Sequence, residues 1–406
     1  MIKRIFYGWW IVLACALIGL YVAGIGFFGF TAFIEPIREE FSWSYTQISF
    51  AASLRGLEMG VFAPLVGFLA DRFGPRKLIF YGIITVGFGL ILLSLTQSLA
   101  MFYGSFLLLA FGAGGCTSVV TMTAVANWFH KRVGIALGVM SSGFGVGGFM
   151  IPLIVMLIDL YQWRTTLIIF GVGMWALGIP LSFVIRNRPE QYGLFPDGEV
   201  SRDQIPNPQS QGKEMEISLK EALKTRPFLY LNMAEAMRMM AIMAVITHVM
   251  PYLSSAGMPR STAGLVAGAI PLFSIIGRFG FGWLGDIFDK RYVMSMVLCL
   301  ISVGTLAFSY VHMKLVIFPF LFLFPLGYGG SMVLRGSILR EYFGRDSFGK
   351  ILGILMGSAA IGSIIGPTLA GWVFDTLGSY HVVWLVLSVL IGLTIVLILR
   401  IKRSPL

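Results

Sequence analysis

Long apolar stretches alternate with short polar ones along the whole chain. A helix needs about 20 mostly apolar residues to cross the hydrocarbon core of a bilayer. Twelve stretches are long enough, at 7–34, 44–70, 77–97, 101–126, 133–158, 164–185, 226–253, 261–284, 291–311, 314–339, 349–374 and 379–400. The pattern therefore predicts an all-α membrane protein with twelve transmembrane helices.

The longest polar stretch, 186–225, divides the twelve predicted helices into two groups of six. It is rich in Pro, Gln, Glu and Lys, which is typical of a linker. Three landmarks recur 215 residues later in the chain, Gly67 as Gly282, Gly134 as Gly349 and Pro152 as Pro367. The shared offset predicts two six-helix bundles, at 1–185 and 226–406, related by a pseudo-two-fold axis along the membrane normal.

Composition and charge agree with a membrane protein. Hydrophobic residues make up 57% of the chain and charged residues 12%, whereas soluble domains carry about 25% charged residues. The net charge of +11 suggests a nucleic-acid partner, but the Lys and Arg stand in short clusters between apolar stretches rather than on one basic face. We therefore expect a lipid bilayer as partner and no nucleic acid.

Lys and Arg are concentrated in alternate loops, including both termini and the linker. Positively charged loops mark the cytoplasmic side of a membrane protein. The pattern predicts a multi-pass protein of the plasma (inner) membrane with both termini in the cytoplasm, and we expect it to function as a monomer.

No catalytic or metal-binding pattern stands out in the chain. The three cysteines lie in apolar stretches without paired spacing, and the four histidines lack ligand spacing. A phosphate-binding loop is also missing from the sequence. We expect neither an enzyme nor a metal or other cofactor.

The loop between the second and third predicted helices resembles the signature loop of the major facilitator superfamily. Its matching residues are Gly67, Asp71, Arg72, Gly74 and Arg76. Glycine permits a tight turn, and a carboxylate beside Arg or a helix N-terminus can hold one conformation closed. The alternative is an ordinary basic loop.

The second half repeats this loop incompletely. It keeps Asp286 but lacks the glycine that follows in the first copy. We expect a weaker latch there, with Arg335 of the tenth helix as the partner of Asp286.

Two further stretches narrow the resemblance. Tyr7-Gly8-Trp9-Trp10 and the stretch 127–138 resemble monocarboxylate transporters and the bacterial oxalate–formate antiporters. In that family an arginine of the eighth helix, followed by a G-x-x-x-D loop, binds the substrate carboxylate. The matching residue here is Arg278, and Gly282 to Asp286 is the matching loop.

Physical chemistry gives Arg278 the same role independently. An arginine within a span costs about 2.5–3.5 kcal/mol on insertion scales, so it should face a wet cavity or an anion. Its planar fork matches a carboxylate. Position 274 is Ser and position 282 is Gly, so its own helix offers no acid one turn away. The alternative is a structural ion pair with an acid on another helix.

Other ionisable residues lie within predicted helices. Arg55 and Glu58 stand three residues apart, as do Glu235 and Arg238, so each pair shares a helix face and is predicted to neutralise itself. In the alternative, Glu235 or Glu58 carries protons. His248 is a candidate for substrate or proton contact, because histidine titrates near physiological pH, but a satisfied core histidine is equally consistent with the sequence.

Hydroxyl groups complete the predicted substrate-binding set with Arg278 and His248. The candidates are Tyr328, Ser274, Thr117 and Thr121. Packing is the alternative for Tyr328, and a bond to the helix backbone is the alternative for the others. Glycines four residues apart, such as Gly264 with Gly268 and Gly353 with Gly357, predict close helix contacts.

The resemblance implies a secondary active transporter of small organic monoanions, such as lactate or pyruvate, working by alternating access. One alternative is carboxylate exchange of the oxalate/formate type with a counter-anion. Residues 351–374 lack the second cation of those exchangers, which favours monocarboxylates with a proton as the coupled ion. A nutrient sensor with a transporter fold is a further alternative, disfavoured by the short linker.

Overall fold

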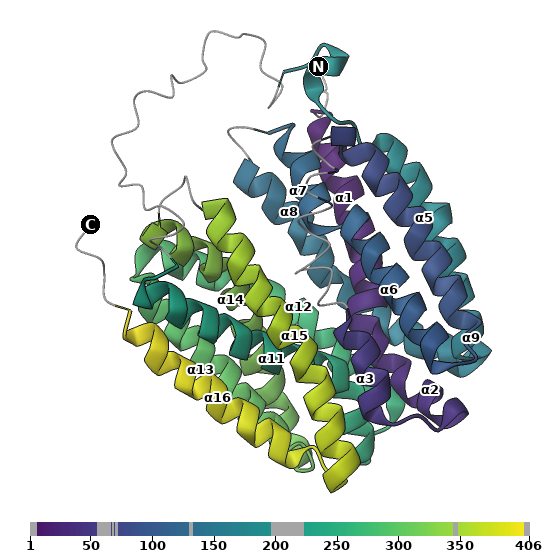
Figure 1. Cartoon of the computed structure of the whole chain (residues 1–406), viewed down its shortest axis with the longest axis vertical. Helices are drawn as coiled ribbons and strands as arrows, with labels where there is room; N and C mark the ends of the chain where they lie inside the picture. The colour runs from purple at the N-terminus through teal and green to yellow at the C-terminus, as the bar shows by residue number, and fades with distance from the viewer. Residues whose placement is uncertain are drawn as a thin grey trace. The chain divides into compact units, whose positions relative to one another are not determined.

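The computed structural model describes residues 6–54, 66, 69, 72–129, 133–195, 223–343 and 348–401. These residues form helices and no strand, which confirms the predicted all-α class. The α-helices, labelled in Figure 1, are α1 (Gly8–Val22), α2 (Ile34–Phe41), α3 (Tyr45–Ser53), α5 (Pro75–Ser94), α6 (Leu99–Cys116), α7 (Ser118–Ala126), α8 (Val133–Val146), α9 (Met150–Val184), α11 (Arg226–Ser255), α12 (Arg260–Ile287), α13 (Lys290–Ser309), α14 (Ile317–Phe343), α15 (Phe348–Leu377) and α16 (His381–Leu399). Short helical segments of other types are η1 (Ala23–Phe28), η2 (Gly29–Ala32), η4 (Gly147–Phe149), η5 (Pro189–Tyr192) and η9 (Lys314–Val316).

Within the described ranges, ten helical stretches are long and apolar enough to cross a membrane. One of them, Ile135–Val184, covers both the fifth and the sixth predicted helices. Its backbone leaves helical geometry at Gln162, where φ is 67°, and this marks the boundary between the two. The second predicted helix, 44–70, is described only in part, beginning as α3.

The chain divides into two compact units. The first comprises Met1–Ala23, Val61–Gly147 and Arg164–Glu214, and the second comprises Gly24–Gly60, Gly148–Trp163 and Met215–Leu406. The predicted division into bundles 1–185 and 226–406 concerns the internal repeat rather than compactness, and it stays a prediction. In the first unit α1 packs on α8, and α5 packs on α6.

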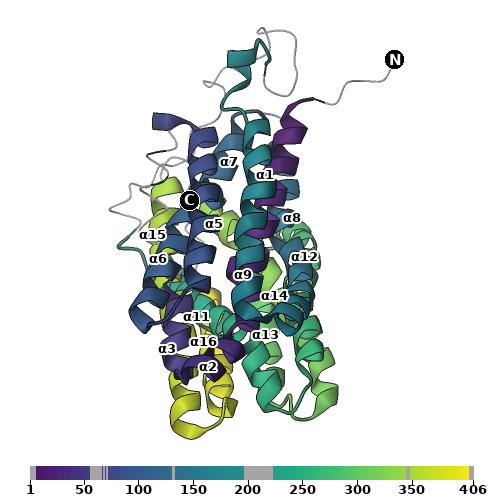
Figure 2. The same cartoon turned by 90° about the vertical axis from the view of Figure 1, so that its right-hand side faces the viewer.

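The second unit is built around two long helix pairs, α11 with α15 and α12 with α14. Helix α13 joins α14 to α16, and α3 packs against α15. Figures 1 and 2 show α2 and α3 at the end of this unit where α15 passes into α16. The unit therefore includes helical segments from the first half of the chain.

Glycines bring α12 and α14 into backbone contact. A Cβ on Gly277 would collide with the Leu326 carbonyl, and one on Gly329 would collide with the Ser274 carbonyl and lie 3.0 Å from the Arg278 nitrogen. Small residues allow such close approach between membrane helices. This contact fixes the position of Arg278 against α14.

The glycines predicted to make close helix contacts differ in what surrounds them. Gly268 faces the Gly148 carbonyl, 2.8 Å from a Cβ built at its position, so it is a packing glycine. No described atom lies within 4 Å of a Cβ at Gly353 or Gly357. The second predicted helix is described only in part, so the close contact predicted for these two glycines stays a prediction. On α15, Gly362 and Gly366 contact the backbone of α11.

The contact between α12 and α14 predicts opposite effects for two Gly→Ala substitutions on α14. Gly329→Ala should lower the apparent melting temperature of the purified protein, because overpacking costs about 1–3 kcal/mol. Gly336→Ala is the matched control, since a Cβ there meets no atom within 4 Å and Ala is the better helix former by about 1 kcal/mol. Equal melting temperatures for the two variants would contradict this packing.

Candidate functional site

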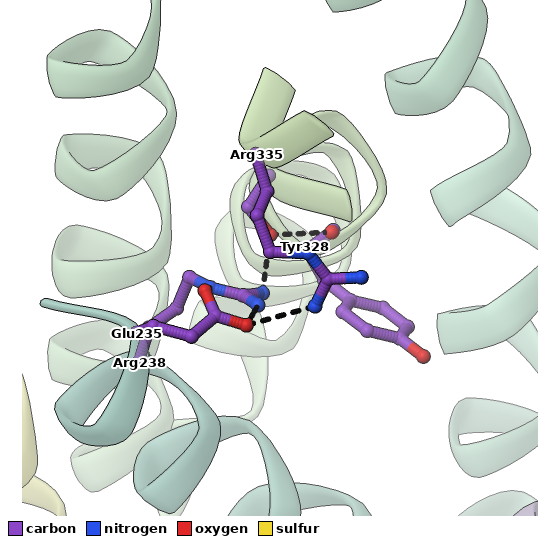
Figure 3. Close-up of polar contacts among 5 residues, drawn as sticks. Glu235, Arg238, Tyr328 and Arg335 are labelled. Atoms are coloured by element: carbon purple, nitrogen blue, oxygen red, sulfur yellow. Dashed lines mark hydrogen bonds and ion pairs between the residues drawn. The ribbon is translucent and has the colours of Figure 1, made fainter. Parts of the chain in front are cut away.

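A buried ion pair on α11 forms the centre of a charge cluster in the second unit (Figure 3). Arg238 donates from Nε to Glu235 Oε2 at 3.0 Å and from Nη2 to Oε1 at 2.6 Å. The exposed fractions of the two side chains are 0% and 2%. The three-residue spacing therefore produces the pair that the sequence predicted, with the two-pronged geometry that arginine favours.

Helix α14 completes the cluster. Arg335 donates from Nη1 to Glu235 Oε1 at 2.8 Å, and Arg238 donates from Nη1 to Ser331 Oγ at 2.7 Å. The Ser331 hydroxyl in turn donates to the Tyr328 carbonyl at 2.7 Å. One carboxylate thus holds two guanidinium groups, so these three charged side chains carry one positive charge in excess when ionised.

The predicted pairing of Arg335 with Asp286 is wrong. Among the described residues, the ion pair of Arg335 is with Glu235, and none joins it to Asp286. Asp286 is exposed near the end of α12, where water solvates its carboxylate. Buried Glu235 has no such solvation and needs cations to offset its charge.

Arg278 and Tyr328 lie beside this cluster. Arg278 is partly buried on α12, with its backbone against Gly329, the residue that follows Tyr328 on α14. The Tyr328 side chain is fully buried, and its hydroxyl lies within electrostatic reach of both Arg278 and Arg238. No described residue completes a hydrogen bond of good geometry to that hydroxyl. The structure thus brings Tyr328 within reach of the predicted residue Arg278 and of Arg238, the partner of Glu235.

Ser274 is less available for a ligand. Its buried hydroxyl donates to the Pro271 carbonyl at 2.6 Å on the same helix. This is the backbone bond that serine and threonine commonly form within helices. A substrate contact through Ser274 stays a prediction.

His248 lies elsewhere in the second unit, in a polar and aromatic hub. It is 13 residues from Glu235 along α11, or about 20 Å at 1.5 Å per residue. Its Nδ1 lies 2.9 Å from the Tyr380 hydroxyl, and its Nε2 lies 2.9 Å from both Ser49 Oγ and the Pro367 carbonyl. Both ring nitrogens thus have partners, which favours the core histidine among the two interpretations.

The same end of the second unit holds an ionic cap that the sequence analysis missed. The Asp375 carboxylate accepts the backbone N–H groups of Tyr45 at 3.1 Å and Thr46 at 2.8 Å. The Tyr45 hydroxyl also donates to Glu35 Oε1 at 2.6 Å. A carboxylate at a helix N-terminus is stabilising, so Asp375 on α15 anchors the start of α3. The only sequence signal was an acidic residue directly after a predicted span.

The signature loop is described only in part. Glu58, Gly67 and Asp71 lie outside the described residues. Gly74 has φ 82° directly before α5, and a Cβ there would lie 2.7 Å from the Asn187 side chain. Arg76 donates its backbone N–H to Asn187 Oδ1 at 3.0 Å, whereas the Arg72 side chain is exposed. Glycine at position 74 is therefore required by backbone geometry, and Asn187 is a partner of this loop that sequence analysis missed.

Thr117 and Thr121 belong to the first unit and are both buried. Thr117 has extended backbone between α6 and α7, and its hydroxyl donates to the Ala113 carbonyl at 2.7 Å. It interrupts the fourth predicted helix. The participation of these two residues in a substrate site stays a prediction.

The described residues hold helices long and apolar enough to cross a membrane, as in a multi-pass membrane protein, and their buried charge cluster marks a candidate functional site. The sequence profile of the Major Facilitator Superfamily matches residues 16–324 and 236–406. The chain belongs to this superfamily, as its signature loop indicated.

Comparisons with individual proteins also find transporters. The chain is 25% identical over 426 residues to Monocarboxylate transporter 12 of Xenopus laevis, covering 98% of this chain and 91% of the relative. It is 24% identical to the uncharacterized MFS-type transporter YcxA of Bacillus subtilis, covering 91% and 89%. A solved structure of a bacterial homolog of the human lysosomal transporter Spinster, inward-facing and unoccupied, has a TM-score of 0.76 at 16% identity and full coverage of both chains. That likeness supports the fold.

The cap on α3 predicts a local stability effect. Asp375→Ala should lower the apparent melting temperature and speed hydrogen–deuterium exchange in α3, because losing a helix cap costs about 0.5–2 kcal/mol. Asp159→Ala is the matched control. Asp159 is 52% exposed and lies 3.6 Å from Arg260, a surface pair worth about 0–1 kcal/mol. Unchanged exchange in α3 of Asp375→Ala would contradict the cap.

Proposed function

We propose that this chain is a secondary active transporter of small organic monoanions, such as lactate or pyruvate, working by alternating access in the plasma (inner) membrane. The observation that carries the proposal is the buried cluster in which two arginines share Glu235. Excess positive charge inside a membrane protein is costly unless an anion balances it. A carboxylate substrate supplies that anion.

Arg278 is the proposed primary ligand of the substrate carboxylate. Its planar guanidinium donates two parallel hydrogen bonds to a carboxylate. The Tyr328 hydroxyl, close to Arg278 and without a hydrogen-bond partner of good geometry among the described residues, is suited to donate to a further oxygen of the substrate. The names of the monocarboxylate transporter relatives support this substrate class.

Carboxylate exchange of the oxalate/formate type is the second candidate, and Arg335 favours it. The preference for monocarboxylates came from the missing second cation in residues 351–374. Arg335 supplies a second cation from α14 instead. If this second cation serves a substrate with two carboxylates, its transport depends on a counter-anion rather than a proton.

Proton coupling depends on whether a titratable side chain within the membrane changes its charge during transport. Arg238 and Arg335 stabilise the ionised form of Glu235 by direct hydrogen bonds. Glu235 therefore takes up a proton only in a conformation in which at least one arginine has moved away. This makes a proton role for Glu235 dependent on the transport cycle.

The substrate assignment predicts a selective loss of uptake. In proteoliposomes the wild-type chain should take up labelled lactate or pyruvate, faster with an imposed inward proton gradient. Arg278→Gln should lose at least about tenfold, because a charge-assisted hydrogen bond contributes roughly 1.5–3 kcal/mol. Arg400→Gln, exposed at the end of α16, is the matched control and should keep its uptake.

Two outcomes contradict this proposal. If Arg278→Gln carries lactate and pyruvate as well as the wild type does, the site assignment is wrong. If the wild type moves only neutral solutes, the substrate class is wrong too. Uptake of oxalate that requires internal formate and ignores the proton gradient would favour the exchanger.

The coupling assignment predicts a separate phenotype. Glu235→Gln should retain exchange of internal for external substrate but lose stimulation by the proton gradient, because the neutral amide carries no proton. The same assay applied to Glu58→Gln and His248→Gln tests the other two candidates. Gradient stimulation that survives in all three variants would remove every coupling residue proposed here.

A further inference from the structure

The two arginines that share Glu235 are not equivalent. Arg238 makes two hydrogen bonds to the carboxylate and one to Ser331, and its side chain is 0% exposed. Arg335 makes one hydrogen bond to Glu235, at 2.8 Å, and its side chain is 19% exposed. The buried Nε of Arg335 has no hydrogen-bond partner among the described residues. All three guanidinium nitrogens of Arg238 thus make hydrogen bonds, whereas Arg335 has a nitrogen available for a further partner.

The charges of the cluster also distinguish Arg335 from Arg238. Glu235 and Arg238 form a neutral pair, so the additional positive charge resides on Arg335. Moving Arg335 away from Glu235 leaves the two-pronged pair intact. Moving Arg238 away would break a fully buried pair, which is strongly unfavourable. An anion that enters the cluster can therefore bind Arg335 at little cost to the structure.

The register of α12 and α14 places Arg335 relative to Arg278. Gly277 contacts Leu326, and Gly285 contacts Leu334, so the two helices run parallel. These contacts put Arg278 level with Gly327, and its backbone nitrogen lies 3.0 Å from a Cβ built at Gly329, so Arg335 lies six to eight residues beyond it. At 1.5 Å per residue the two levels are about 9–12 Å apart. Arg335 lies closer to the end of α14 at Phe343, on the side predicted to face the cytoplasm.

Arg335 and Arg278 are both partly exposed, so the order in which an anion meets them is set by their positions along the two helices. An anion arriving from the side of the linker thus meets Arg335 before it meets Arg278. From the opposite side the order is reversed.

We propose that Arg335 is a second anion-binding residue that acts on one side of the membrane only. Glu235 occupies one of its donors in the empty protein, and the substrate carboxylate takes the place of Glu235 before it passes to Arg278. The ligand class is a small organic carboxylate. This inference rests on the proposed function and adds a side-specific residue to it.

The test measures uptake from each side separately. The protein is reconstituted in proteoliposomes of known orientation, and the half-saturating concentration of labelled lactate or pyruvate is determined for transport from the linker side and from the opposite side. Arg335→Gln should raise the linker-side value by about tenfold, the loss of one charge-assisted hydrogen bond. The value from the opposite side should change by less than about twofold.

Two further variants sharpen the result. Arg335→Lys keeps the charge and should retain a linker-side value close to that of the wild type. Glu235→Gln removes the competing carboxylate and should lower the linker-side value. Size-exclusion chromatography and the melting temperature establish that each variant is folded. If Arg335→Gln is not folded, Glu235→Gln decides: an unchanged linker-side value in that variant overturns the role of Arg335.

The outcomes separate this inference from the proposed function. Equal changes on both sides, or no change on either, overturn the role of Arg335 while leaving Arg278 as the ligand. Absence of carboxylate uptake by the wild type from both sides overturns the proposed function and this inference together. The inference is supported if the linker-side half-saturating concentration rises in Arg335→Gln, stays close to the wild-type value in Arg335→Lys and falls in Glu235→Gln.

Discussion

One buried carboxylate, Glu235, holds two guanidinium groups in the interior of the second unit. Burial of ionised side chains is stable only when opposite charges and hydrogen bonds replace water. Here the acid is satisfied twice, while one of its two arginines retains unused donors. The arrangement is stable in the absence of a ligand and still attracts an anion. The interpretation of the remaining site residues depends on this excess of one positive charge.

The helix packing around the cluster keeps its members in position. Glycines at the contact of α12 and α14 remove the side chains that would hold the two backbones apart. The contact sets the Arg278 backbone beside Gly329, the neighbour of Tyr328 on α14. Rigid helices position such groups more accurately than loops do. A larger side chain at Gly329 would therefore disturb the geometry of the site as well as the packing.

A second polar region lies far along α11 from the charge cluster. His248 contacts α3 through Ser49 and α15 through Pro367, and Asp375 anchors the N-terminus of α3. These bonds join segments from opposite halves of the chain within one compact unit. If the proposed alternating access involves this region, such bonds break and re-form during the cycle. Their chemistry suits that, because each is a single hydrogen bond or a helix cap rather than a buried ion pair.

Much of this protein was determined by its sequence alone. The bilayer imposes a length and an apolar composition on each helix separately, so the spans, the helical class and the superfamily could be predicted from local pattern. The pair of Glu235 with Arg238 was predictable for the same reason, because residues three apart share a helix face. Only the tertiary structure decided which distant groups meet. Arg335 pairs with Glu235, 100 positions away, instead of Asp286, and Asp375 caps α3 from 330 positions away. Such choices depend on how helices pack and on which carboxylates water can still solvate, and neither is encoded in the spacing of residues along one helix.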